Sequence, residues 1–191
     1  MLRVMLVDED AERSQILQEA LQQAGYEVVA RLGSGSDLAA QVGETQPDVI
    51  IIDMDSPDRD ILEHLCSISR DQPRPVVMFT HDDDSTKMRA ALRAGVSAYV
   101  VRGLESERVK PIVEVAMARF QEVQALRKEL GEMKTALADR KLVERAKGIV
   151  MKQRSCTEEQ AYALMRKLAM DRNQRIADVA ENIIDMAKLL T

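Results

Sequence analysis

Val49-Ile50-Ile51-Ile52-Asp53 is a run of four β-branched apolar residues that ends in a carboxylate. A second apolar run, Val4-Met5-Leu6-Val7, ends in Asp8 and Glu9. Short, continuously apolar runs are typical of strands that are buried on both faces of a parallel sheet. If both runs belong to one such sheet, three acidic groups meet in the crevice where open α/β sheets bind their ligands. Such a cluster can hold Mg2+ or accept a phosphoryl group.

Short β-branched runs alternate with amphipathic stretches along the first half of the chain. The connections between them are short and contain glycine, proline or aspartate. This alternation predicts a flavodoxin-like α/β fold, a doubly wound parallel sheet with helices on both faces. We expect strands near residues 2–7, 26–31, 48–52, 75–79 and 98–101, and helices near 11–24, 34–43, 59–70, 84–94 and from about 105 onward.

The composition is that of ordinary globular material, with 46% hydrophobic and 31% charged residues. No apolar run approaches the length of a membrane span, and the charged start is unlike a signal peptide, so we expect a cytoplasmic protein with no membrane partner. Residues 1–107 carry 10 basic and 20 acidic residues, whereas residues 140–191 carry 11 and 7. An acidic first half with a basic end suggests a control module attached to a module that meets a polyanion.

The residues at the predicted strand ends resemble the receiver domain of bacterial response regulators, over roughly residues 1–105. The resemblance implies that Asp53 is the phosphoacceptor and that Asp8, Glu9 and Asp53 hold Mg2+. In this chemistry a carboxylate is the nucleophile, and the metal, a hydroxyl and a cation neutralise charge on the phosphoryl oxygens. The resemblance also implies a regulator rather than a metabolic enzyme. Its supporting residues at the phosphate site would be Thr80, Tyr99 and Arg102.

The chain departs from the receiver pattern at Arg102-Gly103, where the family has Lys-Pro. Arginine keeps the positive charge, but its guanidinium is planar and forked, whereas lysine ends in a compact ammonium group. The exchange is therefore not conservative at a phosphate site. Asp82, Asp83 and Asp84 lie in the loop after Thr80 and are either a solvated loop with one helix-capping residue or a source of repulsion toward a phosphoryl group. Whether Asp53 is a working acceptor or a relic stays open. We expect it to accept phosphate from a small donor poorly or not at all.

From residue 116 onward, apolar residues recur at alternating spacings of three and four, and no further strand is evident. This heptad pattern predicts a long helix with a coiled-coil segment. The stripe either forms the seam of a homodimer or packs back on its own molecule; a helix that extends beyond a completed domain has little of its own core to cover, which favours the dimer. The stripe consists of Ala116, Arg119, Val123, Leu126, Leu130, Met133, Leu137 and Arg140.

The end of the chain predicts two more helices, which form a small three-helix bundle with the end of the long one. Thr157 and Gln160 fit a capping box at the start of the first, and residues 176–190 have amphipathic spacing. The expected core residues are Ile149, Val150, Leu164, Leu168 and Val179. We therefore predict three segments: a receiver-like domain over 1–107, a coiled-coil linker helix over 108–139 and a bundle over 140–191.

The blocks Ala146-Lys147-Gly148-Ile149-Val150-Met151 and Ala161-Tyr162, with Leu164 and Ala169-Met170 after them, resemble the ANTAR domain. This domain is the RNA-binding output of NasT/AmiR-like transcription antiterminators, and the resemblance covers about residues 130–190. It implies that the bundle binds stem-loops of a leader RNA, and that a sensor kinase or a ligand-sensing regulatory protein supplies the signal. The alternative is a phosphorelay protein whose C-terminal helices only dimerise or dock a partner protein.

Basic side chains and one aromatic are the candidates for RNA contact in this region. Arginine planes and aromatic rings stack on unpaired bases, and cations contact phosphates. Lys147 and Arg145 rank first because they lie within the motif block. The full set is Arg140, Lys141, Arg145, Lys147, Arg166, Lys167, Arg172 and Arg175, with Tyr162 as the stacking residue.

Overall fold

The computed structural model of the protein describes every residue except 9, 34–36, 102–105 and 190–191. Five strands and seven helices are present in the described part. The strands are β1 Leu2–Asp8, β2 Tyr26–Leu32, β3 Val49–Met54, β4 Val76–Thr80 and β5 Ala98–Val101. The helices are α1 Ala11–Gln23, α2 Leu38–Thr45, α3 Arg59–Asp71, α4 Ser85–Ala94, α5 Ser106–Arg154, α6 Glu158–Arg172 and α7 Ile176–Leu189.

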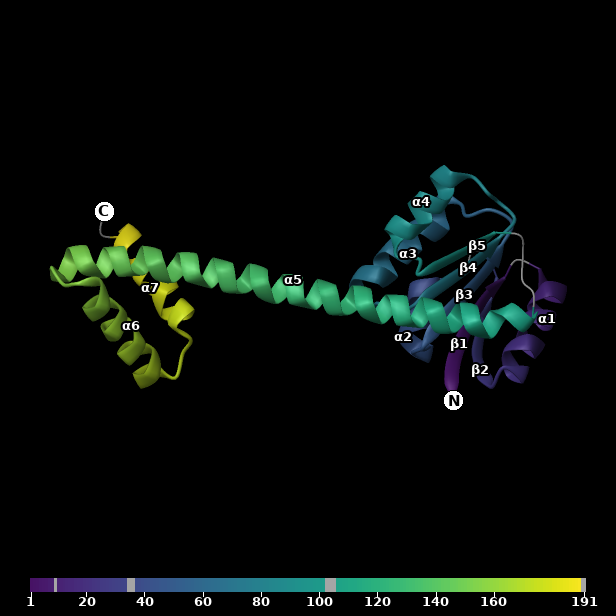
Figure 1. The fold of residues 1–191 in the computed structure, drawn as a ribbon, viewed down its shortest axis with the longest axis horizontal. Helices are drawn as coiled ribbons and strands as arrows, with labels where there is room; N and C mark the ends of the chain where they lie inside the picture. The colour runs from purple at the N-terminus through teal and green to yellow at the C-terminus, as the bar shows by residue number, and fades with distance from the viewer. Residues whose placement is uncertain (9, 34–36, 102–105, 190–191) are drawn as a thin grey trace. The chain divides into compact units, whose positions relative to one another are not determined.

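The strands form one parallel sheet in the order β2-β1-β3-β4-β5 (Figure 1). The strand order reverses between β1 and β3, which is the switch point of a flavodoxin-like fold. The predicted doubly wound sheet is therefore confirmed. Predicted helix 34–43 is observed as Leu38–Thr45, and its first three predicted positions lie outside the described residues.

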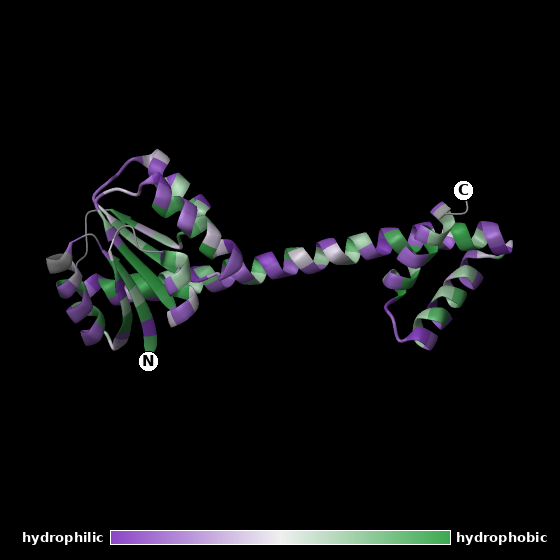
Figure 2. Ribbon diagram, turned by 180° about the vertical axis from the view of Figure 1, so that it is seen from behind, coloured by the Kyte–Doolittle hydropathy of each residue, from purple (hydrophilic) through white to green (hydrophobic). Residues whose placement is uncertain are grey.

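The apolar run of β3 is buried on both faces of the sheet. Ile50 and Ile52 pack in a core with α2, α3 and α4, whereas Val49 and Ile51 pack in a second core with α1 and α5. Because alternate residues of a strand point to opposite faces, a strand covered on both sides must be apolar throughout. In Figure 2 the strands are accordingly mostly hydrophobic, while the helices alternate.

Helix α5 is a single helix of 49 residues, so the predicted long helix is confirmed. The chain divides into two compact units, Met1–Gln124 and Ala125–Thr191, and α5 belongs to both. The segment bounds 1–107, 108–139 and 140–191 stay predictions. In the second unit, α5, α6 and α7 form the predicted three-helix bundle, whose core cluster includes Ala146, Met165, Ala180 and Ile184.

The face that α6 buries differs from the prediction. Leu168, expected in the core, is only half-buried and does not belong to the core cluster. Leu164, expected in the core, is 48% exposed, whereas Met165 is 1% exposed. Ala161, Met165 and Ala169 form the buried stripe of the helix, at spacings of four. The motif block gave no means of deciding between adjacent apolar residues, since only the packing of α5 and α7 decides which one is covered.

Candidate phosphoacceptor site and candidate RNA-binding surface

Two of the three predicted metal ligands meet at the carboxyl edge of the sheet. Asp8 ends β1 and is in direct register with Asp53 on β3. The two residues are 7% and 5% exposed. Thr80 ends the next strand, β4, and is fully buried. Glu9 and Arg102, the third ligand and the expected cation, lie outside the described residues.

The carboxylate pair fits a hard divalent cation. Mg2+ is commonly held by one or two protein carboxylates and keeps several water ligands. Asp8 is oriented for this by its own loop, since its Oδ1 accepts the backbone N–H of Asp10 at 2.8 Å. Within the described residues, no group of three or more His, Cys, Asp or Glu side chains is placed to hold a metal. Among the described residues, Asp8 and Asp53 are the carboxylates that would hold the ion.

Thr80 and Tyr99 both bind the loop that follows β4. The Thr80 hydroxyl donates to the carbonyl of Asp55 at 2.8 Å and accepts the backbone N–H of Asp82 at 3.1 Å. The Tyr99 hydroxyl donates to the carbonyl of Asp82 at 3.2 Å. Burial raises the pKa of Tyr99, so the phenol stays a donor at neutral pH. The predicted hydroxyl and aromatic thus lie together, and both are bonded to backbone.

Lys87 on α4 ties two loops together at this edge. Its Nζ lies 2.7 Å from Ser56 Oγ and 2.7 Å from Asp82 Oδ2. Ser56 also donates to the same carboxylate oxygen at 2.6 Å. We call these three residues the Ser56–Asp82–Lys87 latch. The hydrogen bonds from Lys87 and then Ser56 hold the pKa of Asp82 well below its usual range, so this carboxylate is ionised and paired.

The latch changes the interpretation of the three aspartates after Thr80. Asp82 is neutralised by Lys87, and Asp84 caps α4 by accepting the N–H of Thr86 at 2.7 Å. The predicted capping residue is therefore confirmed, and Asp83 alone of the three has an exposed carboxylate with neither role. Sequence reasoning missed Lys87. The five-residue spacing from Asp82 was a weak signal, and nothing in the sequence pointed to Ser56.

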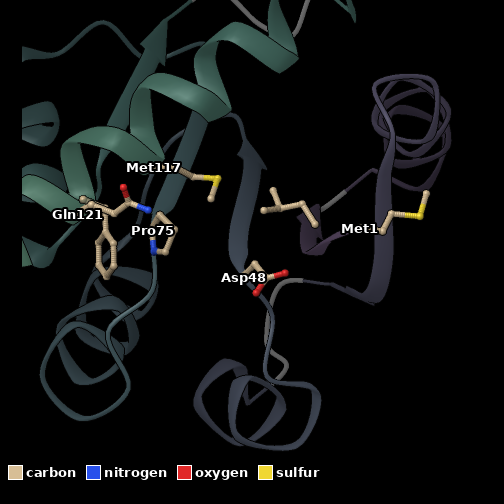
Figure 3. A pocket seen from close by; sticks show the side chains of 7 residues that line it. Met1, Asp48, Pro75, Met117 and Gln121 are labelled. Carbon is tan, nitrogen blue, oxygen red and sulfur yellow. The ribbon is translucent and has the colours of Figure 1, made fainter.

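A separate hollow of about 410 Å³ lies at the opposite ends of the strands, where they begin (Figure 3). Asp48 and Pro75, which border it, directly precede β3 and β4, so they mark the amino ends of the strands. Asp48 is held there by the backbone N–H of Arg3, which donates to its Oδ2 at 2.8 Å. The hollow therefore lies away from Asp53 and belongs to no predicted site.

In the C-terminal unit, two of the predicted RNA contacts are engaged within the protein. Lys147, ranked first, is only 8% exposed, and its Nζ lies 2.8 Å from Glu144 and 2.6 Å from Glu158. These hydrogen bonds raise the pKa of Lys147. Arg175 pairs with Asp178 at 2.7 Å and with Asp139 at 3.5 Å, which links the start of α7 to α5. The geometry favours a structural role for both residues.

The other candidates of this unit are exposed. No ion pair to them is found within the described part of the chain, and Tyr162 is 43% exposed. Tyr162 and Arg166 are four residues apart on α6, so their side chains share one side of the helix. The exposed candidates are Arg140, Lys141, Arg145, Arg166, Lys167 and Arg172.

Comparison with known families covers both units. The response regulator receiver domain family matches residues 4–114, and the ANTAR domain family matches residues 131–184. The transcriptional regulatory protein PdtaR of Mycobacterium tuberculosis is 32% identical over 183 residues, which is 96% of this chain and 89% of that protein. The chain belongs to the ANTAR response regulators.

Two further comparisons each cover one part of this ANTAR response regulator. The nitrate regulatory protein of Klebsiella oxytoca is 36% identical over 80 residues, 42% of this chain and 20% of that protein. A CheY-like receiver domain from Methanospirillum hungatei superposes with a TM-score of 0.56 at 20% identity, covering 64% of this chain and 98% of that domain. The latter supports the receiver fold alone. In the described residues, no helix is long and apolar enough to cross a membrane.

Proposed function

We propose that this ANTAR response regulator is a cytoplasmic transcription antitermination factor. Its C-terminal bundle binds stem-loops of a leader RNA, and its receiver domain controls that binding. The family membership supports RNA-binding antitermination as the class of activity, and the nitrate regulatory protein is a relative over 80 residues. The observation that carries the proposal for this chain is the bundle surface, where Tyr162 is exposed, Arg166 lies four residues away on α6, and the exposed cations have no ion pair among the described residues.

Tyr162 and Arg166 are the proposed base-stacking pair. Stacking on an aromatic ring or a guanidinium plane is the common way to hold an unpaired RNA base. Lys147 and Arg175 are left out of the RNA surface, because each is held by two carboxylates. Arg140, Lys141, Arg145 and Arg172 are the proposed phosphate contacts.

A homodimer through α5 is part of the proposal. The heptad residues Val123, Leu126, Leu130, Met133 and Leu137 are between 38% and 60% exposed, so the chain itself does not cover them. The charges beside the stripe favour a parallel pair. Glu122 and Glu129 stand at g positions, and Arg127 and Lys134 follow five residues after each at e positions. In a parallel coiled coil g pairs with e of the partner, whereas an antiparallel pair would place like charges together.

The seam ends where the bundle begins. The heptad register continues to Glu144 and Lys147, which are ion-paired with one another instead of being apolar. A parallel dimer with its seam ending near Arg140 brings two bundles to the same end, where both can contact one leader RNA. Control would come from the receiver: a sensor kinase acting on Asp53 with Mg2+, or a ligand-sensing protein that binds the receiver, biases the dimer between active and inactive forms.

Binding of the full chain to labelled RNA tests the proposal. The ligands are a hairpin pool with a randomised loop, a single strand of the same composition and a blunt duplex without a loop, each measured by anisotropy over a salt series. We expect preference for hairpins. Tyr162→Ala should cost about 1–3 kcal/mol of hairpin affinity, and Tyr162→Phe, which keeps the ring, should cost little. Equal affinity for all three ligands, or none, would favour the protein-docking alternative.

A further inference from the structure

Three cations and a glycine occupy one face of α5 just beyond the dimer seam. Lys141, Arg145, Gly148 and Lys152 follow one another at spacings of four, three and four, so they lie in one row along the helix. All three cations are exposed. We call these four residues the basic row. Lys152 was not among the residues predicted from the sequence.

Gly148 has no structural reason to be glycine within this chain. It lies inside α5, where glycine costs roughly 0.5–1 kcal/mol relative to alanine. A Cβ built at this position would meet no atom within 4 Å, so the glycine does not serve a close contact within the protein. Its φ is not in the left-handed region either. Its absent side chain leaves bare helix backbone between Arg145 and Lys152.

The ion pairs of the surrounding surface leave the row uncompensated. Glu132 pairs with Lys128 at 3.9 Å, Asp139 pairs with Arg175 at 3.5 Å and Glu144 pairs with Lys147 at 2.8 Å. Each of these acidic residues thus compensates a cation outside the row. No ion pair to Lys141, Arg145 or Lys152 occurs within the described residues. The positive charge of the row is therefore available to an outside anion.

We propose that the RNA backbone lies directly on α5 over Gly148, with its phosphates held by Lys141, Arg145 and Lys152. This inference rests on the proposed function and adds the point of closest approach. The cations follow one another at about 6 Å and then about 10 Å along the helix axis, at 1.5 Å per residue. A chain of regularly spaced phosphates can engage all three, and each contact releases condensed counterions. The missing side chain lets the strand reach the helix surface.

Matched leucine substitutions in the full chain test the glycine. Gly148→Leu should weaken hairpin binding by more than tenfold, because the side chain holds the strand away from the row. Gly131→Leu is the control: Gly131 is exposed and Gly148 is half-buried, but both lie inside α5 with no atom within 4 Å of an added Cβ, and Gly131 lies outside the row. It should leave affinity unchanged. Both changes raise helix propensity, so neither weakens α5 itself.

The salt dependence tests the cations. Lys152→Gln should reduce the slope of log affinity against log salt by about 0.7–0.9. Lys128→Gln, which removes a lysine paired with Glu132, should leave the slope unchanged. If the wild type binds hairpins and both Gly148→Leu and Lys152→Gln behave like wild type, the basic row is overturned and the proposed function stands.

Three other results would also reject the inference. If the wild type ignores RNA, the row and the proposed function fail together. If Gly148→Leu changes the sedimentation coefficient of the RNA-free protein from dimer to monomer, this face is a contact between copies. If poly-glutamate competes as well as hairpin RNA at equal charge, the row takes an acidic protein segment.

Discussion

At the carboxyl ends of the receiver strands, Asp8, Asp53 and Asp82 are buried or bound to neighbouring side chains, whereas in the C-terminal unit most cations are exposed to solvent. Asp8 and Asp53 are less than a tenth exposed, and Asp82 is held by Ser56 and Lys87. On the bundle, Lys147 is buried, whereas the cations of the basic row are exposed. A buried site is located by strand register, but an exposed site is defined by which charges the protein leaves unpaired.

The largest effect is expected at the heptad stripe of α5. This stripe is apolar and exposed, so it resembles neither the buried acidic site of the receiver nor the exposed cations of the bundle. Leu126→Glu with Leu130→Glu should raise the dimer dissociation constant by at least about 100-fold, since burial of each leucine contributes roughly 1.5–3 kcal/mol. Sedimentation velocity measures this. The control is Ala125→Glu with Thr135→Glu, which places the same charges off the stripe. An unchanged dimer in the first variant would mean that the seam lies elsewhere.

The two units also differ in how closely their residues are packed. Glycine substitutions measure this difference. Gly95 ends α4 with a φ of 110°, and an added Cβ would lie 2.6 Å from Ser69 Oγ. Gly95→Ala should therefore lower the free energy of unfolding by about 2 kcal/mol. Gly131→Ala, in open space on α5, should raise it by about 0.5–1 kcal/mol. Urea unfolding of the full chain checks both signs, and equal signs would contradict the comparison.

The Ser56–Asp82–Lys87 latch predicts how the rate of Asp53 phosphorylation changes when the Lys87–Asp82 ion pair is broken. With acetyl phosphate and Mg2+, we expect Asp53 of the wild type to be modified slowly, because the Thr80 hydroxyl is held by the loop backbone. Lys87→Gln and Asp82→Asn each break the ion pair, and both should speed modification several-fold, as followed by intact mass. The two variants change the local charge in opposite directions. Opposite effects on the rate would show that charge, and not the latch, limits phosphorylation.

The smallest effect is expected from substitution of Lys147. It should change stability and leave RNA binding unchanged. Lys147→Met should lower the melting temperature of the C-terminal unit without changing the salt slope for RNA. Lys147 lowers the pKa of Glu158, so the stabilisation by this pair is present at neutral pH and is lost as the pH falls through the folded pKa. The difference between variant and wild type should therefore shrink as the pH falls below the ordinary pKa of a glutamate, about 4.3. A reduced salt slope would return Lys147 to the RNA surface.

The receiver fold and the position of Asp53 could be predicted because they depend on local pattern. A strand buried on both faces must be apolar throughout, and parallel strands must end at one edge, so Asp8, Asp53 and Thr80 meet there. The capping box at Thr157 is equally local: both of its hydrogen bonds, at 3.1 and 3.3 Å, join residues three apart. Such features need no knowledge of the rest of the chain.

The latch and the choice of free cations could not be predicted in this way. Ser56 and Lys87 are 31 residues apart, and Lys147 and Glu158 are 11 apart across a turn. Long polar side chains reach several partners from one position, so sequence spacing does not select among them. The same limit explains Leu164 and Met165, where the expected core residue is exposed and its neighbour is buried.

By itself, the sequence determined the class of fold, the long helix, the two family modules and the acidic edge of the sheet. Each of these follows from periodicity or from residues close together in the chain, where the backbone leaves few arrangements. Only the tertiary structure decided which charges are paired, which apolar side of α6 is covered and that Gly148 lies open among unpaired cations. These depend on contacts between distant elements, because the partner that lies nearest in space determines whether a side chain remains available for binding.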